Sequence, residues 1–120
     1  MRLASVVLGA PDAGELAAFY ERLLGWPRVH EQPGWVKLRA ESGGTAVAFQ
    51  TEAGYVRPTW PAEPGAQQMT AHLDIGADDL DAAVEWACAH GATLAAYQPQ
   101  DDVRVLLDPA GHPFCLFATT

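Results

Sequence analysis

The residues best suited to chemistry in this chain are His72 and Cys115, which occur on two segments expected to be strands. His72 and Asp74 are two residues apart, so an extended backbone places both on one face. An imidazole beside a carboxylate suits a general base or the polar anchor of a ligand, and His72 is the candidate catalytic residue. The alternative is a core histidine that is satisfied by a hydrogen bond to Ser5 or Asp74.

Cys115 has two possible roles. A nucleophilic thiolate would need stabilisation by His72 or by a cation. A small apolar side chain that fills a β-core is a common fate of a free cysteine, and this interpretation is favoured. Alternation along the expected strand places Cys115 and Phe117 on one face. Cys88 lies on the apolar stripe of an expected helix and is predicted to be buried in the core.

Aromatic and cationic side chains form a second candidate set. Trp35, Lys37 and Arg39 alternate along one expected strand and therefore share a face. A ring beside cations suits a flat anionic or aromatic ligand, whereas the alternative is a solvated sheet edge with one exposed tryptophan. Tyr55 and Trp60 occur in a segment rich in proline and glycine, where they either lean over a cavity or cover the end of a sheet.

The elements that must position these residues repeat in two halves, at about residues 1–50 and 69–120, joined by a connector at 51–68. Each half reads as strand, helix and three strands. The expected strands cover residues 3–8, 28–31, 35–40 and 46–50 in the first half and 70–75, 93–97, 103–107 and 113–118 in the second.

Helix ends and turns have clear sequence signatures. Asp12 is expected to cap the first helix, which Gly25 ends, and Asp78-Asp79 to cap the second. Asp108-Pro109-Ala110-Gly111 is strong turn chemistry between the last two strands, because each residue favours a turn for its own reason.

Composition excludes several classes of protein. The 120 residues are 49% hydrophobic and 18% charged, which is ordinary for one soluble globular domain. The formal charge of −8, with seven scattered lysines and arginines, argues against nucleic acid and anionic membrane surfaces as partners. No stretch approaches the ~18 apolar residues of a membrane span. The two cysteines show no dense spacing pattern, so we expect reduced thiols in a cytoplasmic protein.

The two strand–helix–strands units, the segment Ala18–Gly25, the entry His72–Val84 and the closing Asp108–His112 together resemble the vicinal oxygen chelate (VOC) superfamily. That superfamily holds glyoxalase I, bleomycin-resistance proteins, fosfomycin-resistance enzymes and extradiol dioxygenases. The resemblance covers nearly the whole chain and is closest to small glyoxalase-like members. It implies an α+β fold and a single domain, in which two βαβββ units form curved mixed sheets around a cup, with the helices on the outside.

The resemblance also implies where a metal would bind. Metal-using relatives place ligands at the start of each unit's first strand and on its last strand. Carried over, these positions are Ser5, Ala48, His72 and Cys115. Only His72 is an ordinary ligand, since Ala48 has no donor atom and Cys115 binds only as thiolate. A hard divalent ion at these positions would lack most of the ligands of its coordination shell.

A softer ion would need a different set of ligands. Zn²⁺ accepts cysteine sulfur and histidine nitrogen, and a catalytic site needs three protein ligands. His72 and Cys115 supply two, so either Gln50 or Asp74 would have to supply the third. We therefore expect no metal and no other cofactor, with a divalent metal as the alternative.

The sequence thus predicts a metal-independent protein that holds a small organic ligand, aromatic or drug-like, in its cup. This resembles the drug-sequestering branch of the superfamily, in which binding alone gives resistance. The residues expected to contact the ligand are Trp35, Arg39, Tyr55, Trp60, His72 and Cys115.

The alternative is an enzyme: a metal-dependent lyase, isomerase or dioxygenase with a displaced ligand set around His72, or a metal-free enzyme that uses His72 as base. A domain that mainly associates with a protein partner is a third possibility. We expect a homodimer, which the resemblance implies for members of this length.

Overall fold

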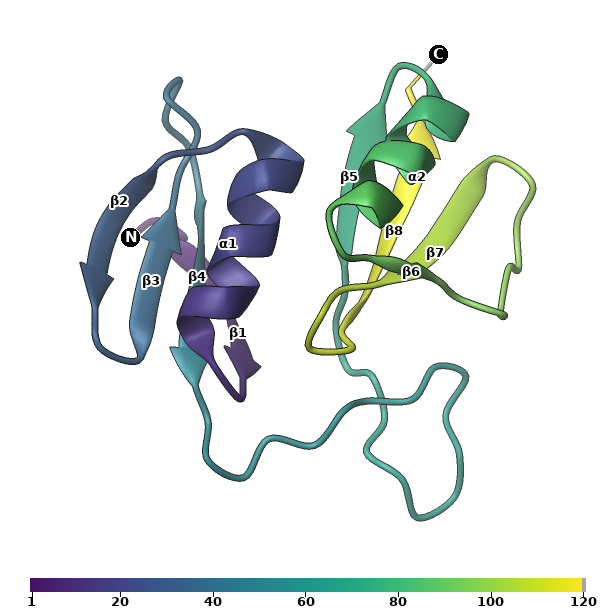
Figure 1. The fold of residues 1–120 in the computed structure, drawn as a ribbon, viewed down its shortest axis with the longest axis horizontal. Coiled ribbons are helices and arrows are strands. Elements are labelled where there is room, and N and C mark those ends of the chain that lie inside the picture. Colours follow the sequence, from purple (N-terminus) through teal and green to yellow (C-terminus); the bar gives the residue numbers. More distant parts are fainter. Residues whose placement is uncertain (120) are drawn as a thin grey trace. The chain divides into compact units, whose positions relative to one another are not determined.

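The computed structural model describes residues 1–119 and divides the chain into two compact units, Met1–Tyr55 and Val56 onward. This division falls inside the expected connector at 51–68. Each unit is a four-stranded mixed sheet with one helix on one of its faces (Figure 1). The predicted α+β class and the repeated βαβββ order are confirmed.

Unit one has its first and last strands side by side. Its elements are β1 (Ser5–Ala10), α1 (Ala13–Leu24), β2 (Arg28–Gln32), β3 (Trp35–Leu38) and β4 (Ala46–Thr51). The strand order is β1-β4-β3-β2, in which β1 and β4 are parallel and the other pairs are antiparallel. A parallel pair needs a crossover, and α1 with the following strands provides it.

Helix α1 begins and ends where its capping residues predict. The Asp12 carboxylate accepts a hydrogen bond from the amide of Glu15, and Gly25 ends the helix with a left-handed φ of 68°. Leu16, Phe19 and Tyr20 on the apolar stripe of α1 are fully buried, whereas its last two leucines, Leu23 and Leu24, are half-buried. The Tyr20 ring stacks on Phe49 of β4. Val36 lies directly opposite Phe49 in the sheet. The helix-facing side of this sheet is therefore the core of unit one.

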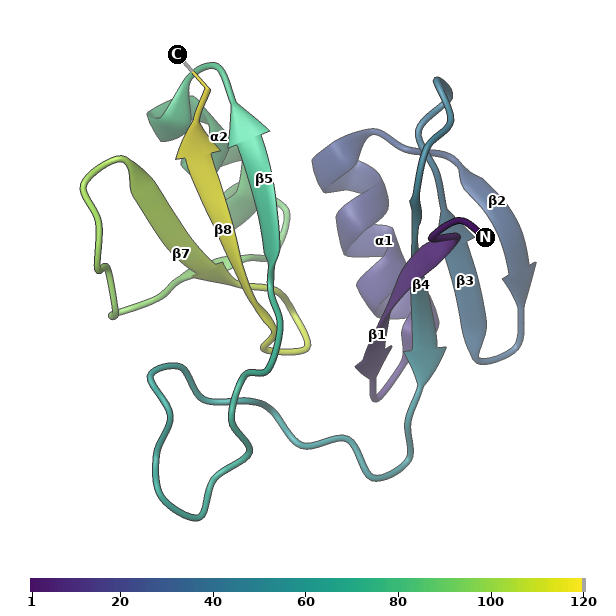
Figure 2. The ribbon, with the colours of Figure 1, turned by 180° about the vertical axis from the view of Figure 1, so that it is seen from behind.

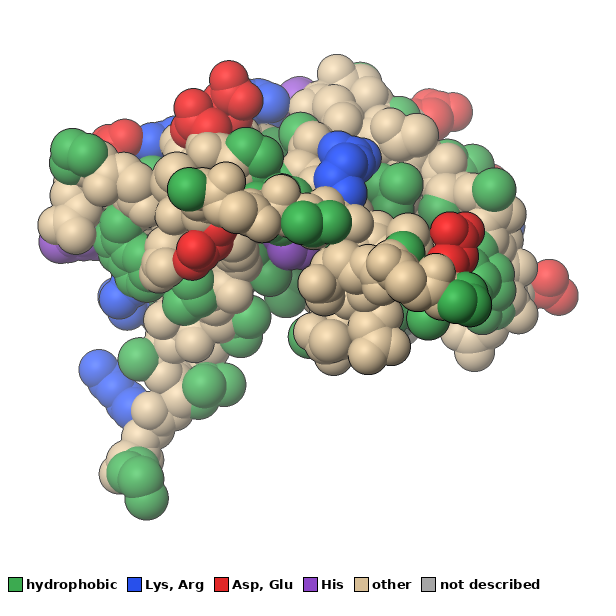
Figure 3. All heavy atoms as spheres, turned by 90° about the horizontal axis from the view of Figure 1, so that it is seen from below, with side chains coloured by type: hydrophobic (Ala, Val, Ile, Leu, Met, Phe, Trp, Pro, Cys, Tyr) green, Lys and Arg blue, Asp and Glu red, His purple; other side chains and the backbone are tan. Residues whose placement is uncertain are grey.

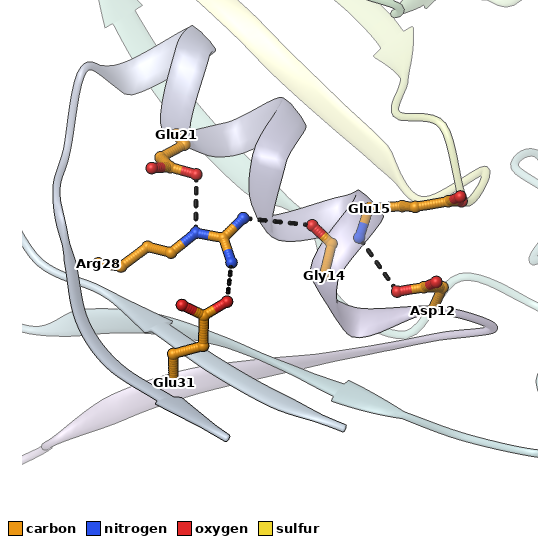
Figure 4. A network of polar contacts seen from close by, with 6 residues as sticks. All are labelled: Asp12, Gly14, Glu15, Glu21, Arg28 and Glu31. Atoms are coloured by element: carbon orange, nitrogen blue, oxygen red, sulfur yellow. Dashed lines mark hydrogen bonds and ion pairs between the residues drawn. The ribbon is translucent and has the colours of Figure 1, made fainter. Parts of the chain in front are cut away.

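Arg28 ties the start of β2 to the surface of α1 (Figure 4). Its Nε donates to Glu21 at 2.8 Å, and its Nη2 donates to the carbonyl of Gly14 at 3.4 Å. Its Nη1 pairs with Glu31 on the same strand. Because Glu21 and Gly14 belong to two different turns of the helix, this one side chain fixes how β2 lies along α1.

Unit two repeats the order of unit one. Its elements are β5 (Leu73–Ala77), α2 (Leu80–Ala89), β6 (Thr93–Leu94), β7 (Val103–Leu107) and β8 (Pro113–Ala118). The strand order is β5-β8-β7-β6, with β5 and β8 parallel. The last two strands have the predicted bounds.

The sheet of unit two has two chemically different faces. Leu106, Phe114 and Leu116 are buried on the face that α2 covers. Alternation turns their neighbours Val105 and Cys115 to the opposite face, which we call the open face. Figure 2 shows this sheet from the side away from α2. The open face is therefore available for a site, whereas the other face serves packing.

Two predicted strands of unit two are shorter or later than expected. The first begins at Leu73, so His72 precedes it instead of lying within it. The strand expected at 93–97 ends at Leu94. Beyond this point the Gln98 side chain takes over hydrogen bonds that a continuing strand would make with β7. Its Nε2 donates to the carbonyls of Ala95 and Val105, and its Oε1 accepts from the amide of Val105.

The prediction that Cys88 is buried is wrong, since its side chain is exposed. In α2, only Ala87 among the described residues is fully buried. Cys88 follows it by one residue, which is a rotation of about 100° around the helix axis. The inward stripe of this short helix is therefore too narrow to include Cys88.

The face of the molecule drawn in Figure 3 does not carry a single field of like charges. Acidic and basic side chains are interspersed with apolar ones on the face drawn in Figure 3. No helix within residues 1–119 is long and apolar enough to cross a membrane.

The predicted turn before β8 is organised by a buried carboxylate. Asp108 is 2% exposed, and its Oδ1 accepts hydrogen bonds from the amides of Ala110 and His112, each at 3.0 Å. Gly111 takes a φ of 90°, which a residue with a Cβ rarely adopts. The turn therefore depends on Asp108 for its hydrogen bonds and on Gly111 for its backbone conformation.

Replacing Asp108 with alanine is expected to lower the free energy of unfolding by about 2–3 kcal/mol, because the buried amide of Ala110 and the half-buried amide of His112 lose their acceptor. Asp108→Asn keeps one side-chain oxygen and should cost about 1 kcal/mol. Urea denaturation followed by circular dichroism measures both values. An alanine variant as stable as the parent would contradict this account of the turn.

Candidate functional site

The open face of unit two carries a pocket of about 420 Å³. This volume lies within the range of small-molecule sites. The pocket is lined by the sheet, by the turn before β7 and by the connector. Its lining residues are Trp60, His72, Asp74, Pro99, Gln100, Asp102, Val103, Val105, Cys115, Phe117 and Ala118.

Strand register places the floor of the pocket. Asp74 of β5 lies opposite Cys115 of β8, which in turn lies opposite Val105 of β7. Two residues further along β8, Phe117 lies beside Gly76. A Cβ at Gly76 would come within 3.2 Å of the Phe117 ring, so the missing side chain leaves room for this ring. The floor is thus a row of carboxylate, thiol and aliphatic groups, followed by an aromatic ring.

The three polar groups of the floor interact with one another. Nε2 of His72 lies 3.1 Å from Oδ1 of Asp74, one of the two partners expected in the core-histidine alternative, but His72 itself is not buried in the core. The donor atoms of His72, Asp74 and Cys115 lie within 4.8 Å of one another. The side chains of His72 and Asp74 are 29% and 63% exposed, so both remain accessible from the pocket.

Burial raises the pKa of the Cys115 thiol, and the Asp74 carboxylate raises it further through its charge and a hydrogen bond. The residue is 4% exposed. A raised pKa keeps the proton on sulfur at neutral pH, so the thiol donates to Asp74 and is a weak nucleophile. The favoured interpretation of Cys115 as a buried packing residue is thus in keeping with the structure, although its thiol also faces the pocket.

Trp60 forms the aromatic wall of the pocket. Its ring stacks on His72 with centroids 4.9 Å apart, and its edge contacts Tyr97 at 5.6 Å. The backbone around it folds back on itself, since the amide of Thr59 donates to Gln67 at 2.7 Å and that of Met69 donates to Thr59. Of the two interpretations of Trp60, the structure supports the one in which it leans over a cavity.

The other predicted contact residues belong to unit one. Trp35 and Arg39 line a pocket of about 300 Å³ together with Lys37, on the sheet face away from α1. Tyr55 lies near Gly9. The structure therefore brings together Trp60, His72 and Cys115 from the predicted set. A single cup shared by all six residues stays a prediction.

Sequence reasoning missed several residues of the pocket. Phe117 shares a face with Cys115 by simple alternation, so the strand pattern could have identified it. Pro99, Gln100 and Asp102 reach the pocket from the turn before β7. No sequence signal marks them, because the position of this turn depends on how Gln98 ends the preceding strand.

The comparisons with known proteins agree with this architecture. Residues 5–117 match the glyoxalase-like domain family, so the chain belongs to this family and to the VOC superfamily. No curated protein matches the sequence.

Several solved structures share the fold. One is a glyoxalase/bleomycin resistance protein/dioxygenase family enzyme from Burkholderia phytofirmans PsJN, with a TM-score of 0.77, 21% identity and 100% coverage of both chains. A glyoxalase-related enzyme from Fulvimarina pelagi has a TM-score of 0.71 and 19% identity, over 99% of this chain and 88% of that one. An antibiotic binding protein from Streptomyces sp. CB03234 has a TM-score of 0.65 and 16% identity, over 100% of this chain and 97% of that one. At these identities the likeness shows the fold alone.

The metal that the superfamily implies does not fit the four carried-over positions. In unit one, Ala48 is buried and has no donor atom, and Ser5 offers a neutral hydroxyl, which is a poor metal ligand. In unit two, His72, Asp74 and Cys115 form a nitrogen, oxygen and sulfur set that suits Zn²⁺ instead of a hard ion. Asp74, one of the two residues considered for the third ligand, thus lies within reach of His72 and Cys115 in the same unit.

Asp74→Asn is expected to lower the pKa of Cys115, because it removes a negative charge that opposes the thiolate. Burial remains, so the pKa should stay above that of an ordinary thiol. The ultraviolet absorbance of the thiolate, followed against pH in a Cys88→Ser background, measures the shift. Asp102→Asn is the control and should change the pKa far less. An unchanged or raised pKa in Asp74→Asn would contradict the hydrogen bond between these residues.

Proposed function

We propose that this protein binds a small organic ligand with a flat ring in the unit-two pocket, without a metal. The observation that carries the proposal is the Trp60 ring, which stands over a pocket of ligand size whose floor is partly apolar. An aromatic wall provides contact area and stacking for a planar ligand at little cost in conformational entropy.

The internal hydrogen bonds of the floor support a metal-free site. Asp74 accepts from the thiol of Cys115 and contacts His72, so none of these three groups depends on an ion for a partner. A metal would have to displace the thiol proton, and burial together with Asp74 opposes this loss.

The comparisons support binding as a function that this fold can perform. One protein with the same fold is an antibiotic binding protein from Streptomyces sp. CB03234. We accordingly propose resistance-type sequestration, in which the pocket holds a drug-like molecule and no bond of the ligand is broken.

The role of Trp60 is tested with a thermal-shift screen of aromatic and drug-like compounds, followed by isothermal titration of the compounds that stabilise the protein. Trp60→Ala is expected to weaken their binding about tenfold, because the ring loses its stacking partner. Trp86→Ala is the matched control, since Trp86 is 53% exposed on α2 and does not line the pocket. Equal affinity in both variants, or no ligand from a broad panel, would contradict the proposal.

The second candidate is a metal-dependent lyase, isomerase or dioxygenase centred on His72. The close approach of three potential ligand atoms in unit two favours it. When bound, a metal would supply Lewis-acid chemistry, and His72, Asp74 and Cys115 would hold it.

Metal analysis separates the two candidates. Protein purified without chelator is expected to contain less than about 0.1 equivalent of zinc, iron, manganese or nickel, because the ligand set lacks an ionised thiol. His72→Ala, compared with His30→Ala on the surface of unit one, should leave this content unchanged. Stoichiometric metal that is lost only in His72→Ala would reverse the preference for a metal-free site.

We also propose that the protein is a cytoplasmic homodimer. The free thiols of Cys88 and Cys115 support a reducing compartment. Strand β1 lies at an edge of its sheet and exposes Val6 and Val7, which supports association through this edge. Light scattering after size-exclusion chromatography tests the oligomeric state.

A further inference from the structure

We infer that the ligand of the unit-two pocket carries a positive charge on or beside its flat ring, as an aromatic amine or amidine does. The inference rests on the proposed function and adds the charge class of the ligand. It follows from the charges that line the pocket, from the positions of the nearby arginines and from the aromatic wall.

The lining of the pocket is negative. Asp74 and Asp102 contribute two carboxylates, and no lysine or arginine lines the pocket among the described residues. His72 adds at most one positive charge. The summed charge of the side chains that line the pocket is therefore negative with or without a charge on His72. An anionic ligand would meet repulsion in either case.

The two arginines of unit two are engaged elsewhere. Residues 56–120 contain no lysine or arginine besides Arg57 and Arg104. Arg57 lies against Gly111, with its guanidinium directed at the turn before β8 and its Nη1 donating to the carbonyl of Pro109. Arg104 donates to the carbonyls of Asp101 and Val103, at 2.8 and 2.9 Å. Arg104 also contacts the carbonyl of Gln100 at 3.4 Å. Neither arginine lines the pocket, and among residues 1–119 no ion pair joins either one to Asp74 or Asp102.

Both carboxylates have room for a further donor. A carboxylate offers about four acceptor positions, and Asp74 uses only part of them for His72 and Cys115. Its side chain is 63% exposed. Asp102 lies in the turn directly before β7. Within residues 1–119 no cationic side chain forms an ion pair with it. An ammonium or amidinium group is the natural partner for these oxygens.

The aromatic wall favours the same charge. The face of an indole is electron-rich and attracts cations, and this attraction grows where water is excluded. Beneath the pocket, Val105 and Cys115 are buried, which reduces the screening of charges at the floor. A planar cation therefore gains stacking against Trp60 and Coulomb attraction to the carboxylates in the same site.

The pocket of unit one is lined by cationic side chains instead of carboxylates. It is lined by Lys37 and Arg39 beside Trp35, which is the set whose sequence pattern suits a flat anion. The charge preference inferred for unit two is thus a property of its own lining, and the charge of the chain as a whole does not account for it.

Three probes of similar shape and different charge test the inference: naphthylmethylamine, naphthylmethanol and naphthoate. Isothermal titration should show that the amine binds about tenfold more tightly than the alcohol, and that naphthoate binds most weakly. The preference should shrink as salt is added, because the carboxylates are partly exposed.

Asp102→Asn should reduce the preference of the amine over the alcohol by several-fold, because it removes one of the two carboxylates that line the pocket. Asp101→Asn is the matched control, since it removes one charge from the same turn but does not line the pocket. Thermal unfolding verifies that both variants fold. Asp102 is exposed in a turn, so its replacement should not affect folding.

The outcomes separate the inference from the proposed function. If the alcohol or naphthoate binds as tightly as the amine, or if both variants behave alike, the charge inference is overturned. In that case the proposed function is still supported if Trp60→Ala weakens the binding of the probes. If no probe binds in the pocket, both the inference and the proposed function are overturned.

Discussion

The candidate site depends on the contacts that the Asp74 carboxylate makes with His72 and Cys115. Asp74 stands on the edge strand β5, opposite Cys115 in the parallel pair with β8, and it contacts the His72 imidazole at 3.1 Å. Burial raises the pKa of the Cys115 thiol, and a carboxylate in this position raises it further; the same carboxylate contacts the ring of His72, on which Trp60 stacks. Asp74 thus links the thiol at the pocket floor to the histidine that supports the aromatic wall.

The fold makes this arrangement possible because each sheet buries only one face under its own helix. In unit two, leucine and phenylalanine side chains face α2, while the alternate residues of the same strands form the pocket floor. Period-two alternation therefore assigns packing and ligand binding to opposite faces of one sheet. In unit one the same alternation separates Val36, under α1, from Trp35 on the other face.

The sequence was sufficient for the repeated βαβββ order, the caps at Asp12 and Gly25 and the turn at Asp108, because these features depend on local chemistry. The sequence was insufficient where a contact between distant residues determines the end of a strand or the exposure of a side chain. Gln98 ends the strand that propensity would extend to residue 97, and α2 leaves Cys88 exposed. Within the site, alternation identified the face of Cys115, and Asp74 was one of the two partners expected for His72. Asp102 was missed because only the folded turn brings it to the pocket.

A crystal structure of protein prepared without chelator and soaked with an aromatic amine tests the central claim most directly. The account predicts a flat ring against Trp60, with its charged group near Asp74 or Asp102, and Cys115 within hydrogen-bond distance of Asp74. An ion bound jointly by the imidazole, the carboxylate and the sulfur at about 2.0–2.3 Å would contradict it.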